Sequence, residues 1–499
     1  MSEWRRIAKK VRDECADSLI EPNNDAAWDE QIDGFLEFNA AWLPLDRPYK
    51  ETRKTLEAMA SARKNLRDFG PQSQHVTRTG KRELRVNAPK SSLDGARDSV
   101  LRSGGRRKPE TTQQFRIGTS EELDAIGLVK RTGGEPNQFT PIINVALDPW
   151  LKVAKENLLK EFANLCDACK IIELAKAPAP GAFRFDASIL LRDRWSAVFE
   201  EQGLKYQNAA RSVEGARQFG ETHVAPLLKK MSEIFPYVAC IVADGDRMGR
   251  AIDACKMPDA HRELSRALSA FAEKAGVIVK KHGGSLVYAG GDDVLAFAPV
   301  STAVTCAAEL ASTFRGELAP IIALNEAATL SVGIGIGHVM QRMGYLLELG
   351  RDGERLAKSE RNSLAVVVDK RSGGRIEWSE KWEDDPKTQL TFADNAAENI
   401  DEATFPARRI YEIKSICSRL PDSVPPQDDR DWARLLRLEV RRAISRTDIG
   451  AEGNLSKVGP KFGDDDGYVD SQRKVEHWVS RMLIARLLAS ATPRLKGEA

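Results

Sequence analysis

The order of apolar and polar positions between residues 236 and 368 predicts alternating strands and helices. Tyr237–Ala243 is a continuous apolar run rich in β-branched residues, which is typical of a strand buried on both faces. Apolar residues at steps of three or four then predict a helix over His261–Lys281. The same two patterns predict the remaining elements, which are the strands Ser285–Tyr288, Val294–Pro299, Ala328–Ile336 and Ser363–Val368 and the helices Val300–Phe314 and Met343–Ser359.

This order, β-α-β-β-α-β followed by one more helix and strand, is that of the ferredoxin-like fold, a four-stranded antiparallel sheet with helices on one face. We therefore predict an α+β chain, in which a ferredoxin-like palm domain is combined with a mainly helical connector and a helical C-terminal domain. In this topology the first strand lies beside the central hairpin. Residues at the end of that strand are therefore expected to approach the hairpin turn.

The hairpin turn carries the clearest chemical signal in the chain, Gly290-Gly291-Asp292-Asp293. Glycines permit a sharp turn that residues with a Cβ resist. Two adjacent carboxylates repel each other unless a positive group is present, and Mg²⁺ commonly bridges such carboxylates to substrate phosphates. The motif thus suggests nucleotide chemistry. The alternative is a solvated turn, where Gly and Asp are common for conformational reasons.

A second acidic turn follows the first predicted strand, which ends on Asp244. A carboxylate at the tip of a buried strand is well placed to hold a metal ion rigidly. Gly245 would let backbone N–H groups approach a phosphate, and Arg247 would offer positive charge to it. We expect Gly245, Asp246 and Arg247 to contribute to nucleotide binding.

The predicted topology brings Asp244 close to Asp292 and Asp293. Metal ions held by shared carboxylates can activate a hydroxyl and steady a leaving pyrophosphate, so the pattern predicts nucleotidyl transfer from a triphosphate with Mg²⁺ or Mn²⁺. Lys358, near the end of the helix Met343–Ser359, could bind the β- and γ-phosphates. Its alternative is a solvated lysine that the helix dipole favours at this end.

These motifs resemble a known family. Asp244-Gly245-Asp246-Arg247-Met248-Gly249 and Gly290–Asp293 are similar to the second palm domain of the large subunit of type III CRISPR effector complexes, with subtype B as the closest match. Lys90–Leu101 and Glu122–Arg131 resemble further segments of that subunit. The resemblance covers most of the chain from about Trp28 onward.

The resemblance implies a reaction in which ATP bound between two facing palms is joined into cyclic oligoadenylate. Target RNA that binds the guide-loaded complex switches the reaction on, so the implied partners are guide RNA, target RNA and the other subunits of the complex. By resemblance, Asp292 and Asp293 are the catalytic metal-binding pair and Asp244 is the third carboxylate. Gly290 and Gly291 would shape the turn and contribute to nucleotide binding, and Lys358 would contact the triphosphate.

The sequence also departs from the family. Many members begin with a nuclease domain marked by a His-Asp dipeptide, but none of the six histidines here precedes an Asp. The early strand and helix of a first palm are not evident before Trp28. Either the first palm is reduced, or its missing part lies on another polypeptide.

Two alternatives to the synthase therefore stay open. The chain could be a scaffold that binds guide and target RNA while its palm is silent. It could also be a diguanylate cyclase, which has a related Gly-Gly-acidic-acidic turn, although no sensory or receiver module is readable.

The chain divides into four expected domains. Residues 1–140 form a reduced first palm-like region with basic loops, 141–230 a helical connector, 231–375 the palm and 376–499 a helical C-terminal domain.

Net charge is only +2, yet Ser61–Ser120 holds fourteen Lys and Arg against five Asp and Glu. Basic loops suit phosphate backbones, so we expect contact with guide or target RNA there. A solvated linker is the alternative.

Patterns outside the palm give further expectations. Trp28–Phe69 is predicted to be helical, Trp150–Leu174 one long amphipathic helix, and Trp378–Asp401 polar and irregular. The acidic run Asp464–Asp466 has no matching ligand spacing and is expected to be solvated.

Composition limits the remaining possibilities. Hydrophobic residues make up 42% and charged residues 30% of the 499, and no apolar run approaches the length of a membrane span. No apolar signal region follows Met1, so we expect a cytoplasmic protein without membrane contact.

Seven cysteines do not suggest a disulfide framework. Cys166 and Cys169 form a lone Cys-x-x-Cys, and a zinc site needs about four ligands, so two buried helical cysteines are favoured.

Overall fold

The computed structural model of the chain divides into two compact units, Met1–Gln138 and Phe139–Ala499. Five of the fourteen cations of the predicted basic stretch lie outside the described residues, namely Arg67, Arg78, Lys81, Arg85 and Arg116. The structure describes residues 2–496 except 23, 37, 66–73, 77–81, 85–88, 94, 109–110, 112–114, 116, 119, 135–139, 177–180, 208–211, 322–327, 391–406 and 446–458.

The first unit is mainly helical in its described part, with a core formed by residues such as Leu19, Trp28 and Leu128. The predicted helix Trp28–Phe69 is wrong in its middle, because α2 ends at Asp33 and α3 begins only at Tyr49. Pro44 and Pro48 lie in the gap, where a proline would remove a helical hydrogen bond. The elements are α1 (Ser2–Cys15), α2 (Asp25–Asp33), α3 (Tyr49–Asn65), the antiparallel pair β1 (Gln74–Val76) and β2 (Arg82–Leu84), η1 (Gly104–Arg106) and α5 (Ala125–Thr132). The expectation of a reduced first palm in this region stays a prediction.

The second unit begins with helices that pack around their own apolar core, including Trp150, Phe199 and Phe219. The helix predicted over Trp150–Leu174 is two helices, because the chain leaves helical geometry at Leu158 with φ −127° and ψ 48°. The elements are α6 (Ile142–Asn157), α7 (Leu159–Ile171), η2 (Ala187–Leu190), η3 (Arg192–Arg194), α8 (Trp195–Glu201), α9 (Ser212–Phe219), the π-helical turn η4 (Gly220–Val224) and α10 (Ala225–Lys230).

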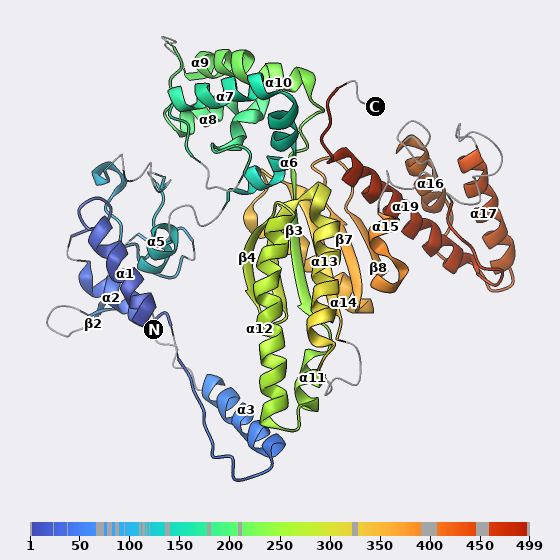
Figure 1. Cartoon of the computed structure of the whole chain (residues 1–499), viewed down its shortest axis with the longest axis horizontal. Helices are drawn as coiled ribbons and strands as arrows, with labels where there is room; N and C mark the ends of the chain where they lie inside the picture. The colour runs from blue at the N-terminus through green and yellow to red at the C-terminus, as the bar shows by residue number, and fades with distance from the viewer. Residues whose placement is uncertain are drawn as a thin grey trace. The chain divides into compact units, whose positions relative to one another are not determined.

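A six-stranded mixed sheet is the centre of the second unit (Figure 1). Its strands lie in the order β4-β5-β3-β6-β7-β8, and every neighbouring pair is antiparallel except β6 and β7. The strands are β3 (Tyr237–Gly245), β4 (Ser285–Gly290), β5 (Asp293–Pro299), β6 (Leu330–His338), β7 (Ser363–Val368) and β8 (Ile376–Lys381). The helices between them are α11 (Met248–Ala254), α12 (Pro258–Lys281), α13 (Val300–Leu318) and α14 (Met343–Glu360).

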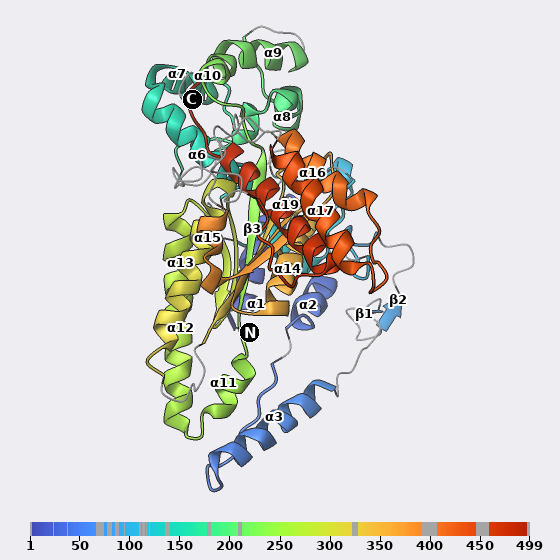
Figure 2. The same ribbon diagram turned by 90° about the vertical axis from the view of Figure 1, so that its right-hand side faces the viewer.

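The first four strands of this sheet have the predicted ferredoxin-like order, which confirms the α+β fold class. The prediction that the helices all lie on one face of the sheet is wrong. α12 and α13 cover one face, and α14 covers the other (Figure 2). Parallel strands need a crossover connection, and α14 is the crossover from β6 to β7. On central strand β3, Ile241 packs toward α12 and α13, whereas Cys240 packs toward Leu346 of α14.

Glycines let α14 approach the sheet unusually closely. A Cβ on Gly333 of β6 would lie 1.9 Å from the backbone nitrogen of Glu354, and one on Gly335 would lie 2.3 Å from the nitrogen of Gly350. Only residues without a side chain can bring a helix backbone this near a strand. The close approach fixes the depth at which α14 presents its last turn, including Lys358, to the end of β3.

The sheet ends in a strand that the sequence did not predict. Residues from Trp378 on were expected to be polar and irregular, but β8 pairs antiparallel with β7 over Ile376–Lys381. Ile376 and Trp378 are buried while Glu377 between them is exposed, the alternation of a half-buried strand.

The chain continues through η5 (Trp382–Asp384), α15 (Pro386–Gln389), α16 (Ala407–Arg419), α17 (Asp429–Ser445) and α19 (Tyr468–Ser490). α19 packs against β8, and Trp378 shares a core with Tyr468 and Trp478. In the part of the chain that the structure describes, no helix combines the length and apolar character needed to cross a bilayer.

Candidate metal and nucleotide site

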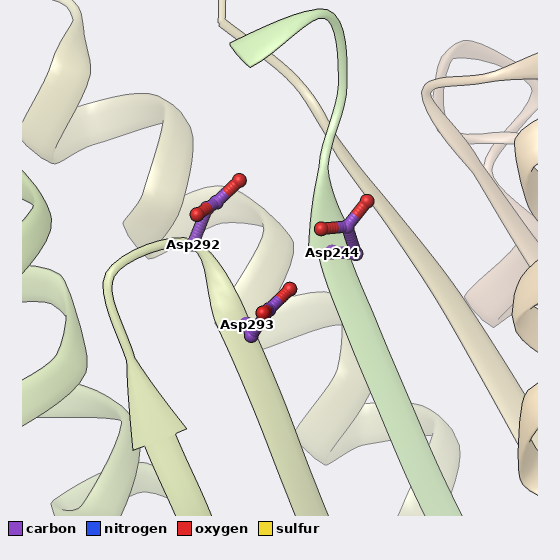
Figure 3. Close-up of side chains that lie close together, drawn as sticks. All are labelled: Asp244, Asp292 and Asp293. Atoms are coloured by element: carbon purple, nitrogen blue, oxygen red, sulfur yellow. The ribbon is translucent and has the colours of Figure 1, made fainter. Parts of the chain in front are cut away.

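Three carboxylates meet where the central strand and the hairpin turn end at the same edge of the sheet (Figure 3). Asp244 lies near the end of β3, Asp292 in the turn after β4, and Asp293 at the start of β5. One oxygen from each of the three lies within 4.8 Å of the others. Within the described residues, this is the group of acidic, His or Cys side chains close enough together to hold a metal ion.

The turn between β4 and β5 depends on its glycines. Gly291 has φ +70°, a left-handed conformation that side chains rarely adopt. A Cβ on Gly290 would lie 2.0 Å from the hydroxyl of Tyr288. The two glycines therefore let the chain reverse so that Asp292 and Asp293 follow at once and face β3.

The negative charges of the three carboxylates repel one another. A hydrogen bond to Asp244, burial, and the charges of Asp244 and Asp292 raise the pKa of Asp293 to about 7. Burial, with a contribution from the charge of Asp244, raises the pKa of Asp292. A bound cation removes the cost of keeping such carboxylates ionised together. Carboxylate oxygens are the ligands that Mg²⁺ and Mn²⁺ prefer, so these residues fit the predicted metal.

Gly245 sets how close the two acidic turns can come. Its Cβ, if present, would lie 2.8 Å from the Cβ of Asp292 and 2.7 Å from the Cγ of Met248. The Cγ of Met248 can move by a rotamer change, but the Cβ of Asp292 moves only with its backbone, so a substitution would push the hairpin turn that carries Asp292 away from β3.

A Gly245→Ala variant is therefore expected to fold and to bind Mn²⁺ about tenfold more weakly, as for other changes that displace a metal ligand. Titration of the full chain with Mn²⁺, followed by electron paramagnetic resonance, measures this. Gly249→Ala is the matched control, because a Cβ there would meet nothing within 4 Å. Equal Mn²⁺ affinity in both variants would contradict the assignment of Asp292 as a ligand.

Lys358 reaches the group from the last turn of α14. Its Nζ donates to the carbonyl oxygen of Gly245 at 2.7 Å and forms an ion pair with Asp244. The same ammonium lies 3.4 Å from Asp246 Oδ1. The structure thus brings Lys358 to the three carboxylates, while its contact with a triphosphate stays a prediction.

Asp246 lies only two residues beyond Asp244 but is not one of the three carboxylates of the group. Asp246 is only 6% exposed, and its carboxylate accepts hydrogen bonds from Thr329 Oγ1, Ser331 Oγ and the backbone nitrogen of Asn362, each at 2.8 Å. Asp246 is thus a buried, hydrogen-bonded carboxylate, and its contact with a nucleotide stays a prediction. Arg247 beyond it is exposed, with φ +56° at the start of α11.

Sequence reasoning missed Glu354, a half-buried residue one turn before Lys358 on α14. Burial and the negative charge of Asp244 raise the pKa of Glu354, so Glu354 interacts electrostatically with the carboxylate group. The spacing of four between Glu354 and Lys358 places both on one side of the helix, and this was the signal available in the sequence.

The Cys-x-x-Cys pair lies within α7, as favoured by the sequence. Cys169 is buried and Cys166 half-buried, both are free thiols, and burial raises the pKa of each. The acidic run expected to be solvated is exposed at Asp464 and Asp465, while Asp466 bonds to Lys474 and to the backbone nitrogen of Gly463.

Comparison with known proteins shows which family the palm is similar to. Residues 237–365 match the family described as Cas10/Cmr2, second palm domain. The chain is 26% identical over 287 residues to the CRISPR system Cmr subunit Cmr2 of Pyrococcus furiosus. That match covers 49% of this chain and 30% of the Pyrococcus protein, so the chain spans less than a third of the length of this curated relative.

Two solved structures extend the comparison. A chain of a type III-B Cmr-beta complex, solved by cryo-EM in the apo state, aligns with 98% of this chain and 67% of its own length, at TM-score 0.51 and 11% identity. Csm1 of T. onnurineus aligns with 52% of this chain and 38% of its own length, at TM-score 0.34 and 20% identity. The first of these likenesses shows a shared fold.

Proposed function

We propose that this chain, whose residues 237–365 match the second palm domain of Cas10/Cmr2, is the palm subunit of an RNA-guided, antiviral type III CRISPR effector complex. The similarity of the chain to a Cmr2 subunit supports this proposal. In this proposal the palm converts ATP to cyclic oligoadenylate when target RNA binds. The observation that carries it is the convergence of Asp244, Asp292 and Asp293 inside the residues that match the family. Guide RNA, target RNA and the other subunits of the complex are the proposed partners.

Each residue of the site has a proposed role. Asp244, Asp292 and Asp293 would hold Mg²⁺ or Mn²⁺, which when bound supplies the Lewis-acid chemistry that activates a hydroxyl and steadies a leaving pyrophosphate. Lys358, with its ammonium already beside Asp244, would meet the triphosphate oxygens. Arg247 follows Asp244 closely in the chain and would add positive charge for the phosphates.

The test uses the chain assembled with the other effector subunits and guide RNA. Addition of matched target RNA, ATP and Mg²⁺ is expected to yield cyclic oligoadenylate, detected by mass spectrometry. Little product is expected with unmatched RNA, and none when this chain is left out. The omission control assigns the product to this palm rather than to a contaminating synthase.

Two other outcomes would replace the proposal. An assembled complex that binds target RNA but makes no cyclic oligoadenylate would favour the scaffold, in which the palm is silent. A product formed from GTP alone, without target RNA, would favour a diguanylate cyclase.

A further inference from the structure

We propose that Asp246 is a positioning residue, which fixes the Lys358 ammonium beside the carboxylate group so that a polyphosphate meets a cation already in place. The inference rests on the proposed function, because it concerns how the same site receives its triphosphate. It assigns Asp246 neither to the metal nor to the nucleotide. Preorganised charge of this kind is effective because no reorganisation is needed when the ligand arrives.

The first observation is the set of donors around the Asp246 carboxylate. Oδ2 accepts from Thr329 Oγ1 and from the backbone nitrogen of Asn362, and Oδ1 accepts from Ser331 Oγ, each at 2.8 Å. A buried carboxylate is costly unless such bonds satisfy it. These bonds hold Asp246 in one orientation, with Oδ1 3.4 Å from Lys358 Nζ.

The second observation is the set of contacts around the Lys358 ammonium. A lysine ammonium sits on a flexible four-carbon stem and has three donors. Here the Gly245 carbonyl lies 2.7 Å from Lys358 Nζ, Asp244 forms an ion pair with it, and Asp246 is the buried second anion. Of the two anions, Asp244 belongs to the predicted metal ligands, so its contact with Lys358 would change when a metal binds. Asp246 and the Gly245 carbonyl are the contacts that would remain.

The third observation is the loop that ends the lysine-bearing helix. Arg361, between α14 and β7, has φ +61° and ψ 161°, a conformation otherwise almost confined to glycine, which persists only when its surroundings enforce it. Asn362 follows with φ +47°, which asparagine tolerates. Asp246 accepts a hydrogen bond from the backbone nitrogen of Asn362 directly. The same carboxylate therefore ties down both Lys358 and the end of the helix that carries it.

The test is a double-mutant cycle in the full chain, with binding of the non-reacting analogue α,β-methylene-ATP in Mn²⁺ measured by calorimetry. Asp246→Asn keeps the shape and removes the charge, and it is expected to weaken analogue binding about tenfold, the scale of a lost supporting contact. In a Lys358→Met background the same change should alter binding by less than about twofold, because the two residues act through one interaction. Asp259→Asn, an exposed aspartate on α12, is the charge control.

Equal weakening by Asp246→Asn in the Lys358 chain and in the Lys358→Met chain would overturn the proposal, since Asp246 would then act through the general structure of the palm. Should Asp246→Asn fail to fold, the pair Thr329→Val and Ser331→Ala loosens the same carboxylate while keeping its charge. That pair is then expected to weaken analogue binding in the Lys358 chain and not in the Lys358→Met chain. Equal weakening in both would overturn the proposal in the same way.

A second readout separates this inference from the proposed function. Crystal structures of the Asp244→Asn chain and of the Asp244→Asn, Asp246→Asn chain, both without metal, need neither nucleotide nor catalysis and remove the Asp244 charge that would otherwise hold Lys358. The Lys358 ammonium is expected to stay on the Gly245 carbonyl in the first chain and to leave it in the second, while the body of α14 stays packed against β6. A lysine that keeps its position in the second chain would overturn the positioning role, whereas an unsubstituted chain that binds no Mn²⁺ would count against the proposed synthase only.

Discussion

An Asp292→Ala, Asp293→Ala double variant is expected to lose both Mn²⁺ binding and cyclic oligoadenylate formation by at least about 100-fold. Loss of a residue that merely supports a metal ligand already costs about 10–100-fold, and this variant removes two of the three proposed ligands themselves. The remaining carboxylate, Asp244, is paired with Lys358. Calorimetric titration with Mn²⁺ and the product assay on the assembled complex measure the two losses.

The chain offers a matched control for this variant. Asp464→Ala with Asp465→Ala removes the same two charges from an exposed adjacent pair and should leave metal binding and product unchanged. Target RNA binding should survive in both variants, since neither change lies in the basic stretch. The melting temperature of the metal-free Asp292→Ala, Asp293→Ala chain should not fall, because burial and mutual repulsion disfavour the charges it loses. Persistent product would mean that the site is assigned to the wrong residues.

A Gly333→Ala variant is expected to lower the free energy of unfolding of the palm by at least about 3 kcal/mol, the upper range for overpacking a core. The added Cβ would lie 1.9 Å from the Glu354 nitrogen and 2.3 Å from the Gly353 carbonyl carbon. Both are backbone atoms, so no rotamer change can relieve the contact, and α14 must move away from β6. Urea unfolding of the full chain, followed by tryptophan fluorescence, measures the loss.

Gly344→Ala is the control for this effect, because it adds the same methyl group to α14 where nothing lies within 4 Å. Alanine is the better helix former, so the control should be as stable as the unsubstituted chain or slightly more so. Any folded Gly333→Ala chain should also bind the ATP analogue more weakly, since Lys358 moves with the helix. Equal stability of the Gly333→Ala and Gly344→Ala chains would contradict the close approach of α14 to the sheet.

The sequence predicted the palm well because its signals there are local. Tyr237–Ala243 is apolar throughout, and the paired glycines mark the hairpin, so β3 and the turn could be placed without any knowledge of their neighbours. Once the order of strands was known, the meeting of Asp244 with Asp292 and Asp293 followed from topology. The strand Ser363–Val368 was predicted with the bounds that the structure gives.

The features that were missed depend on packing between distant segments. Nothing in the residues next to Asp246 shows that Thr329, Ser331 and Asn362 will surround it, so its burial was not foreseen. The second helical layer was missed for a similar reason, because the need for glycine in β6 arises only from the close packing of α14 against that strand. β8 has an alternating pattern, but it is short and follows a turn rich in glycine and charge.

The bond from Lys358 to the Gly245 carbonyl joins residues 113 positions apart, which has a consequence for synthesis on the ribosome. The three acidic residues and β3 emerge first, and β6, which completes the pairing of β3, emerges later. During that interval β3 is an apolar strand with one edge unpaired, the kind of surface on which nascent chains associate wrongly. The lysine that pairs with Asp244 and the loop that binds Asp246 emerge after all three acidic residues, so the contacts of this site are completed only once β6 and α14 have left the ribosome.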